Sequence, residues 1–343
     1  MKKSAQEKLL SISIIIVNRN GGKKLCKCLE QISRQDYTKE LIEILIIDGG
    51  STDDSKKLAE KFGARFIDGG FPENMEARRH VGVIQAKNEI IAFIDTDNYL
   101  PAADWLRRMV QPLIANKKIM AAETLHYQYN KSDVLFNRYC ALFGINDPVA
   151  FYLGKADRMP HYYNSWHQSG KATDHGNYVE VEFGQDLPTV GCNGFLIRRE
   201  ILLKVLTRPE AFFHIDIIYD LVMKGYNRIA FVKTAITHDT SDSFKNLVDK
   251  RINYYSNHGL ALNMERRYKV FDPAKPKDVI SILIYVIGSI TIIRPLFDSF
   301  RGFIKKPDVA WFLHPVVCLV FAYAYGMVVV NLVTKRFSKV RST

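Results

Sequence analysis

Cysteine is scarce in this sequence, and its spacing fits no metal site. Five cysteines occur in 343 residues, and the close pair, Cys26 and Cys28, falls on a segment with a helical pattern. Scattered cysteines without a secretory context are typical of reduced structural thiols. The apolar run at the N-terminus is short and no small-residue cleavage site follows it, so we do not expect a signal peptide.

Other signatures are also missing. No G-x-G-x-x-G follows the first apolar run, which argues against a dinucleotide-dependent oxidoreductase. Acidic residues are outnumbered, 36 against 48 basic ones, and a basic chain often binds nucleic acid. Here many basic residues flank two apolar stretches near the C-terminus, where they suit anionic lipid headgroups. We therefore expect a membrane and no nucleic acid as partner; the flanking residues are Lys275, Lys277, Lys305, Lys306, Lys335, Arg336, Lys339 and Arg341.

The two apolar stretches differ in length. Residues 311–333 contain no Asp, Glu, Lys or Arg, and about 20 such residues cross a bilayer. Residues 279–293 are fewer and end at Arg294 and Pro295, so they suit a tilted span, a re-entrant segment or an interfacial helix. We expect helices at about 279–297 and 311–333 that form a hairpin, with the rest of the chain on the cytoplasmic side. If the first stretch only lies in the interface, the C-terminus ends up outside.

The first 120 residues alternate between strand and helix patterns. This alternation predicts right-handed βαβ units and a doubly wound, mostly parallel sheet. From 121 to 190 the pattern loosens, and we expect loops and edge elements there. Later we expect a helix that stops at Gly225, a strand that ends at His238 and a basic helical segment at 243–259. The early strands are predicted at 11–17, 42–48, 64–68 and 89–95, and the helices at 24–34, 53–62, 75–87 and 102–117.

Polar groups follow three of these strands. The sequences are NRNGG after the first, DGGSTDD after the second and DTDN after the fourth. Carboxyl ends of parallel strands meet at one edge of a sheet, which is where open α/β folds bind ligands. Asp95 and Asp97 would then face a ligand or a cation, although a turn that caps the next helix is an alternative reading of the same residues.

Four segments occur in an order that resembles glycosyltransferase family 2, the inverting enzymes of the GT-A fold. They are SIIIVNRNGG, ILIIDGGSTDDS, EARRHVGVIQAKNEIIAFIDTDN and GCNGFLIRRE, within residues 11–240. The resemblance implies a Rossmann-like nucleotide-sugar-binding half at 1–120, an acceptor-binding and catalytic half at 121–265 and a C-terminal membrane-associated region at 266–343. It also implies a divalent metal, Mn²⁺ or Mg²⁺, which offsets the charge of the departing diphosphate.

The resemblance assigns roles to individual residues. Asp48 would recognise the nucleotide base, with Val17, Asn18 and Arg19 as the neighbouring wall. The strand end with Asp95 and Asp97 would bind the nucleotide sugar and the metal, and the glycine-rich loop GCNGF would bind the acceptor. Further donor contacts would be Arg78, Asp95 and Thr96. The metal ligands would be Asp97 and His238, while Asp95 would contact the ribose or a metal-bound water. The acceptor loop would contain Gly191, Asn193 and Gly194. Two interpretations of Arg79 stay open: a functional residue or a solvated residue on the helix surface.

The general base departs from the family pattern. Relatives carry a Glu-Asp pair before a helix that resembles LVMKGY, and the matching positions here are Phe213 and His214. Three readings stay open: Asp216 is the base, His214 assists, or the acceptor is an ionised phosphate that needs none. The Gln-x-x-Arg-Trp motif of processive synthases is absent from the sequence, which favours transfer of one sugar.

Together these features predict a membrane-anchored, metal-dependent inverting glycosyltransferase that uses a UDP- or GDP-sugar. The expected acceptor is a lipid-linked or cell-envelope glycan, and the expected location is the cytoplasmic face of the cell membrane. A polyprenyl-phosphate sugar synthase is the first alternative. A non-catalytic nucleotide-sugar-binding membrane protein is the second.

Overall fold

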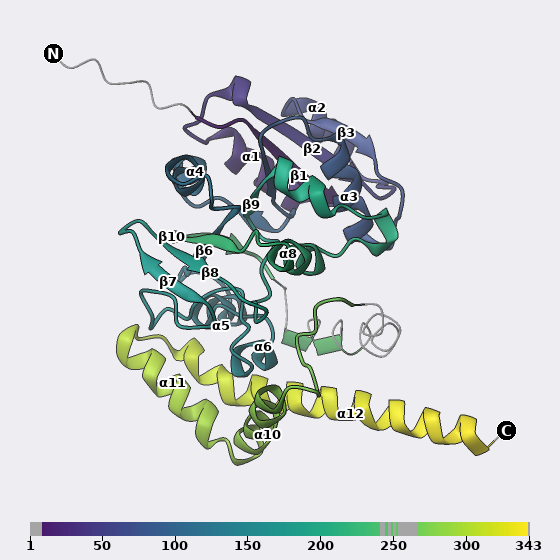
Figure 1. Ribbon diagram of the computed structural model, residues 1–343, viewed down its shortest axis with the longest axis vertical. Coiled ribbons are helices and arrows are strands. Elements are labelled where there is room, and N and C mark those ends of the chain that lie inside the picture. Colours follow the sequence, from purple (N-terminus) through teal and green to yellow (C-terminus); the bar gives the residue numbers. More distant parts are fainter. Residues whose placement is uncertain (1–8, 241–243, 246–247, 250–251, 253–265, 342–343) are drawn as a thin grey trace. The chain divides into compact units, whose positions relative to one another are not determined.

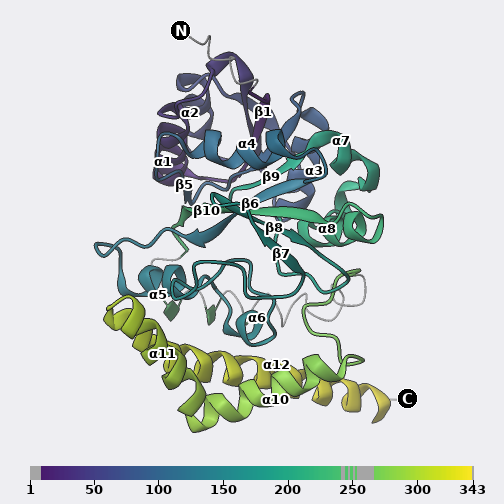
Figure 2. The ribbon, with the colours of Figure 1, turned by 60° about the vertical axis from the view of Figure 1, so that its left-hand side comes forward.

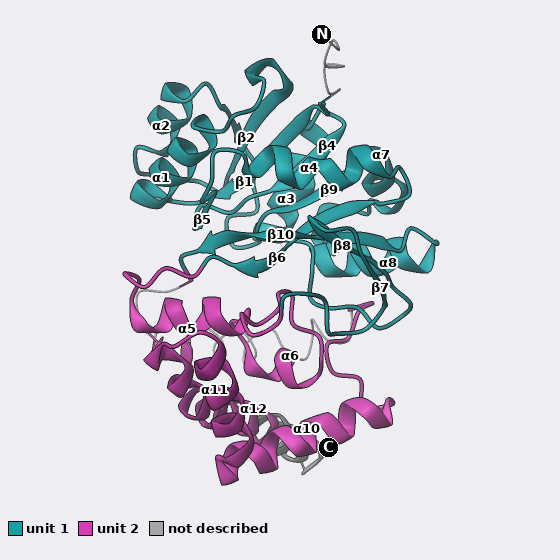
Figure 3. Cartoon of the chain, turned by 90° about the vertical axis from the view of Figure 1, so that its left-hand side faces the viewer, with its two compact units in different colours: residues 1–128, 164–239 teal, residues 129–163, 240–343 magenta. Residues whose placement is uncertain are grey.

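The computed structural model describes residues 9–240, 244–245, 248–249, 252 and 266–341. Two compact units divide the chain, and Figure 3 colours them separately. Unit 1 comprises residues 1–128 and 164–239, and unit 2 comprises residues 129–163 and 240–343. The predicted segment 121–265 is therefore divided between both units. Its assignment as the acceptor half stays a prediction.

Unit 1 is built on one mixed sheet of ten strands (Figures 1 and 2). Its first half is parallel, as predicted, and antiparallel pairs enter from β9 onward. The order is β3 (Arg65–Asp68), β2 (Ile42–Asp48), β1 (Ile12–Asn18), β4 (Ile90–Phe93), β9 (Phe195–Arg198), β6 (Ala121–Tyr127), β10 (Arg228–His238), β8 (Tyr178–Glu182) and β7 (Lys171–Asp174). The short β5 (Asn98–Tyr99) pairs with β10.

The early elements form where the sequence predicts them. All seven residues of β1 are buried, as expected for a strand covered on both faces. The helices are α1 (Gly22–Ser33), α2 (Ser55–Lys61), α3 (Met75–Gln85) and α4 (Trp105–Ala115). Gly82 lets α3 lie close to the sheet, since a Cβ there would come within 2.5 Å of the Ile15 side chain.

The prediction of loops at 121–190 is wrong for β6. This strand lies inside the sheet between β9 and β10, and its polar residues Glu123 and Thr124 are fully buried. Because the strand is buried on both faces, its sequence AAETLHY shows no alternation of apolar and polar residues. The prediction of edge elements holds for β7, which ends the sheet and is exposed along its length.

The later part of unit 1 follows the prediction. Helix α8 (His214–Met223) ends just before Gly225, whose φ of 88° suits the stop. Strand β10 ends at His238 as expected. The remaining short elements are η1 (Lys39–Leu41), α7 (Arg199–Leu202), η2 (Leu203–Val205) and η3 (Pro209–Ala211).

Unit 2 is helical among its described residues. Its core joins aromatic side chains from distant segments, among them Phe143, Trp311 and Phe321. The predicted basic helical segment at 243–259 falls mostly outside the described residues. The elements are α5 (Leu135–Phe143), α6 (Pro148–Tyr152), α10 (Pro276–Thr291), α11 (Ile293–Lys305), η4 (Val309–Leu313) and α12 (His314–Arg341).

The expected single helix at 279–297 is wrong. The chain breaks at Ile292, which has a φ of 63°, and α10 and α11 meet at a bend of 85°. Pro295 explains the break, because it has no N–H to donate to a preceding turn. The second stretch is helical as predicted, and residues Val309–Val330 are long and apolar enough to cross a membrane, with a mean hydropathy of 2.0.

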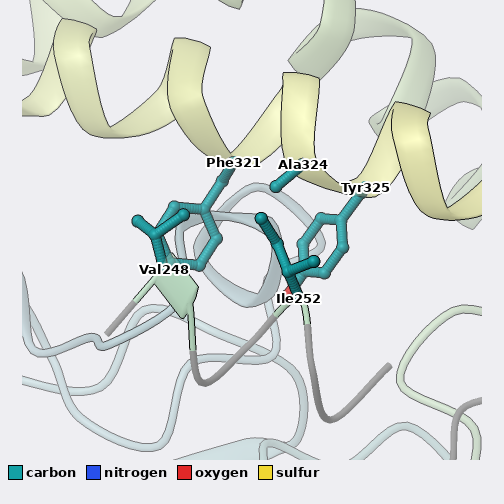
Figure 4. A pocket seen from close by; sticks show the side chains of 5 residues that line it. All are labelled: Val248, Ile252, Phe321, Ala324 and Tyr325. Carbon is teal, nitrogen blue, oxygen red and sulfur yellow. The ribbon is translucent and has the colours of Figure 1, made fainter. Parts of the chain in front are cut away.

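A small apolar pocket lies in unit 2 (Figure 4). It is lined by Val248, Ile252, Phe321, Ala324 and Tyr325. Carbon atoms make up almost all of this lining, so the pocket offers little for a charged sugar nucleotide. Every predicted donor, metal and acceptor residue belongs to unit 1 instead.

Candidate active site

The end of β2 places Asp48 in a cradle of donors. Asn18 is its register partner on β1, and the Asn18 amide donates to Asp48 at 2.8 Å. The backbone N–H groups of Gly50 and Ser51 donate to the other carboxylate oxygen at 2.9 and 2.7 Å. Burial opposes the charge of Asp48, but these bonds outweigh it and lower its pKa. The carboxylate is therefore ionised and fixed in place.

One polar atom beside this cradle lacks a partner. Asn18 is buried, and among the described residues its Oδ1 accepts no hydrogen bond. A buried acceptor without a donor is costly unless a ligand supplies one. The predicted donor residue Val17 lies beside it, buried on β1. This strand end therefore has an acceptor available for an N–H group of a ligand.

Two arginines close the same edge of the sheet. Arg78 from α3 is buried and donates to the carbonyls of Phe71 and Pro72 at 2.9 and 2.8 Å. Its guanidinium passes so close to Gly49 that a Cβ there would lie 2.1 Å from Nη1. Arg19, more exposed, pairs with Glu73. Both predicted donor residues thus frame the loop between β3 and α3.

Asp97 and His238 are brought together by strand pairing. His238 pairs with Asn98 in the antiparallel β5–β10 ladder, and the Asp239 N–H donates to the Asp97 carbonyl at 2.9 Å. The Asp97 carboxylate and His238 Nε2 are 3.7 Å apart, and the two side chains are 29% and 13% exposed. Burial raises the pKa of Asp97, while His238 and Lys24 outweigh it and lower the pKa.

These two side chains fit part of a metal site. A carboxylate oxygen and an imidazole nitrogen are both accepted ligands of Mn²⁺. Among the described residues, however, no group of three or more His, Cys, Asp or Glu side chains converges on one point. Asp97 and His238 would hold the ion, and substrate oxygens or water would complete its coordination.

The Asp95 carboxylate binds Arg79. Both of its oxygens accept from Nη2 of Arg79, at 2.8 and 2.7 Å. Arg79 has a side chain only 3% exposed, so its reading as a solvated helix residue is wrong. Burial opposes the charge of Arg79, but Asp95 and Glu76 more than compensate and raise its pKa. Thr96, between the two acids, is partly exposed.

The predicted acceptor loop is held by close backbone contacts. Gly194 has a φ of 86°, and its N–H donates to the Phe93 carbonyl at 2.7 Å, which ties the loop to the end of β4. The side-chain Oδ1 of Asn193 accepts a hydrogen bond from the Asn98 side-chain amide at 3.3 Å, beside Asp97. Gly191 has a φ of 120° and faces His214. The loop therefore reaches both the acidic strand end and the start of α8.

His214 forms a buried ion pair that the sequence did not reveal. Its backbone N–H donates to Glu76 at 2.9 Å, and its Nδ1 lies 3.0 Å from the same carboxylate. Glu76 also pairs with Arg79. Burial lowers the pKa of His214, but Glu76 outweighs it and raises the pKa to about 10. His214 therefore carries a proton at neutral pH and is poorly suited to accept another.

Asp216 is the remaining predicted base. It lies in the first turn of α8 and is only 2% exposed. A general base must reach the proton that it removes. In this conformation Asp216 would need a movement of α8 or of the acceptor loop to do so.

Glu76 and Arg79 are the site residues that the sequence analysis missed or left undecided. Their spacing of three residues puts them on one face of α3, together with Gly82 and Val83, which are buried. Charged residues on a buried helix face indicate an internal ion pair. That periodicity was the signal available in the sequence.

The sheet order and the acidic strand ends can be compared with those of known proteins. Residues 13–173 match the profile of glycosyl transferase family 2. The fold resembles that of a mannosyltransferase from Pyrobaculum calidifontis solved with GDP-Man and Mn²⁺, with a TM-score of 0.51, 14% identity, and coverage of 92% of this chain and 87% of the other. This likeness confirms the GT-A fold.

Two curated relatives match shorter regions. Glycosyltransferase AglE of Haloferax volcanii is 27% identical over 139 residues, 37% of this chain and 43% of the relative. A dolichyl N-acetyl-glucosaminyl phosphate glucuronosyltransferase of Methanococcus voltae is 60% identical over 42 residues, 12% of this chain and 13% of the relative. The chain thus aligns with less than half the length of each of these relatives.

The Glu76–His214 pair predicts how stability depends on pH. Glu76 has its pKa lowered to about 2, because Arg79 and His214 outweigh burial, and the pKa of His214 is raised to about 10. The pair is fully formed between the ordinary pKa values of Glu and His, about 4.5 and 6.5. Its stabilisation is lost as the pH rises from there through 10, or falls through 2.

We therefore expect the midpoint of thermal unfolding to fall as the pH rises from 6.5 to 10, and to fall less in His214→Gln. His167→Gln serves as the matched control, because His167 is exposed and its Nδ1 lies 2.8 Å from the Ser165 backbone carbonyl. Equal slopes in His214→Gln and the unchanged protein would refute the assignment of a buried imidazolium.

Proposed function

We propose that this protein is a metal-dependent inverting glycosyltransferase that transfers one sugar from a UDP- or GDP-sugar. The observation that supports it best is the edge of the unit 1 sheet. There, the unpaired acceptor of Asn18, the fixed carboxylate of Asp48 and the Asp97–His238 pair follow strands of one sheet. The match of residues 13–173 to glycosyl transferase family 2 and the GT-A fold agree with this function.

The proposed division of labour follows from the contacts. Asn18 and Arg19 bind the nucleotide, while the Asp48 carboxylate, whose oxygens already accept four hydrogen bonds, orients the turn at Gly50 and Ser51. Arg78 keeps the loop after β3 in place. A divalent cation on Asp97 and His238 would offset the negative charge that the departing nucleoside diphosphate gains.

The proposed acceptor is a lipid-linked or cell-envelope glycan. The Methanococcus voltae relative is named for a dolichyl-linked acceptor, and of the two relatives described above it has the higher identity over its short match. A glycan hydroxyl must lose a proton during transfer, and Asp216 is the carboxylate closest in sequence to the expected base position. The acceptor loop at Gly191, Asn193 and Gly194 would hold the sugar.

A phosphate acceptor is the second candidate function, favoured by a specific observation. At the position of the family's base the chain carries His214, which already holds a proton, and Asp216 is almost completely buried. A polyprenyl phosphate is ionised at neutral pH and needs no base. Its transfer reaction would make a polyprenyl-phosphate sugar.

We also propose that unit 2 attaches the protein to the cell membrane. Helices α10, α11 and α12 expose large apolar side chains, among them Ile287, Ile293, Phe297, Ile304 and Tyr323, each more than half exposed. Helix α10 has 16 residues, or about 24 Å, and is short for a bilayer. Because α11 turns away from it at 85°, the bent pair suits the interface better than the hairpin expected from sequence. Residues 309–330 then form the single span.

Asp97 provides the test of metal-dependent donor binding. We expect Asp97→Asn to abolish transfer and to remove the effect of Mn²⁺ on nucleotide-sugar binding, measured as a shift in thermal unfolding. Asp48→Asn is the contrasting variant, which should weaken binding while the response to Mn²⁺ persists. An unaltered Mn²⁺ titration in Asp97→Asn would exclude the ligand role.

Asp216 distinguishes the two acceptor classes. For a glycan acceptor we expect Asp216→Asn to lower turnover by about 10²- to 10⁴-fold with little change in donor affinity, because a general base acts mainly on the rate. The matched control is Asp220→Asn, one turn further along α8 and partly exposed. Near-normal turnover in Asp216→Asn would favour the phosphate acceptor.

Cysteine accessibility tests the proposed topology. With one span, an impermeant maleimide should label a cysteine added after Thr343 in intact cells, and should leave Lys305→Cys, an exposed position on α11, unlabelled. Gly302 is unsuitable for the tag, because a Cβ there would lie 2.4 Å from the Trp311 ring. Labelling of Lys305→Cys with a protected tail would instead establish the hairpin.

A further inference from the structure

An exposed arginine near the end of α11 rests against two tyrosine rings of unit 2. The guanidinium carbon of Arg301 lies 4.7 Å from the ring centres of both Tyr162 and Tyr163. Arg301 is exposed, and among the described residues it forms no ion pair and donates no hydrogen bond. The rings attract the face of the guanidinium and leave its N–H groups unused. These donors have the planar, forked geometry that binds two oxygens of one phosphate group.

A second cation lies in the same part of unit 2. Lys306 is the C-terminal cap of α11. Its Nζ lies 4.1 Å from the centre of the Tyr129 ring and 3.2 Å from Nδ1 of His161, the residue that precedes the two tyrosines. We call this cluster the Arg301 patch, and it comprises Tyr129, His161, Tyr162, Tyr163, Arg301 and Lys306.

Two carboxylates lie close to the patch in sequence, and both already have partners. Asp298 is only 1% exposed and accepts a hydrogen bond from Nε of Arg294 at 3.1 Å. Asp308 is buried, accepts a hydrogen bond from the Tyr129 hydroxyl and lies 3.5 Å from Nη2 of Arg138. Because these carboxylates bind other donors, the cations of the patch are available for an external anion.

The patch borders an exposed apolar face of α11. Four side chains spaced four, three and four residues apart share this face and are each at least half exposed: Ile293, Phe297, Phe300 and Ile304. Arg301 follows Phe297 by four residues and therefore lies beside it on the helix surface. Lys306 comes three residues before the proposed span, which begins at Val309. Cations at the border of an apolar helix face and just outside a span are placed to meet lipid headgroups.

We propose that the Arg301 patch binds the phosphate group of an anionic phospholipid, whose acyl chains lie along the apolar face of α11. Arg301 binds two phosphate oxygens, and Lys306 contributes a second positive charge. The exposed apolar face beside the cations favours a lipid over a soluble phosphate, because only the lipid covers both. The inference rests on the proposed membrane attachment of unit 2, but it requires neither sugar donor nor acceptor.

Lipid binding to the full chain in a nonionic detergent tests the proposal. We expect native mass spectrometry to show tighter binding of short-chain phosphatidylglycerol than of phosphatidylcholine. Arg301→Gln should weaken the binding of phosphatidylglycerol at least about fivefold, the factor that one basic residue contributes at an anionic lipid surface. Lys305→Gln is the matched control. It removes the same charge from an exposed neighbouring position, and it should change this binding less than about twofold, as expected for a solvated surface charge.

A second matched pair applies if Arg301→Gln does not fold, which its thermal unfolding would reveal. Lys306→Gln and Lys305→Gln alter adjacent residues in the same way, and only Lys306 belongs to the patch. We expect the larger loss of phosphatidylglycerol binding in Lys306→Gln.

Three results would overturn the proposal: equal losses in the patch variants and in Lys305→Gln, equal binding of the two lipids, or displacement of phosphatidylglycerol by an equal concentration of inorganic phosphate. Cell fractionation tests the membrane attachment separately. Recovery of the full chain in the soluble fraction would refute that attachment and the lipid site with it. Recovery with the membranes, together with equal losses in the variants, would refute the lipid site alone.

Discussion

A chain of buried charges holds the candidate active site together. Asp95, Arg79, Glu76 and His214 form consecutive ion pairs that link the end of β4, helix α3 and the start of α8. Removing one member of such a buried pair costs about 3–5 kcal/mol, because the partner is left charged and unpaired. The acceptor loop, which packs against His214 at Gly191, takes its position from the same chain of contacts.

Much of the nucleotide-binding half could be predicted from the sequence. Strands β1, β2 and β4 are largely apolar runs followed by polar turns, and this pattern follows from their burial inside a parallel sheet. The proximity of Asn18 and Asp48 then follows from strand register alone. The local sequence pattern is enough to predict the position of a side chain wherever that position depends only on a strand and the turn after it.

Contacts between distant segments escaped prediction. The position of β6 depends on β9 and β10, which come some 70 to 100 residues later in the chain, so its sequence gives no sign of its central place. Asp95 looks like a ligand in sequence, and only the packing of α3 shows that Arg79 occupies both of its oxygens. The same packing reveals Glu76 as the partner of His214. Such pairings depend on tertiary structure, which no local pattern encodes.

The charge network also bears on the proposed metal site. Because Arg79 holds Asp95, Asp97 and His238 are the predicted ligands that remain for a cation at this strand end. Dications with few protein ligands bind mainly through substrate phosphates and water. Under the proposed function, the nucleotide diphosphate would then supply much of the coordination, so that cation and donor bind together rather than in sequence. Under the same proposal, the Arg79–Asp95 ion pair would thereby make binding of the cation depend on the bound donor.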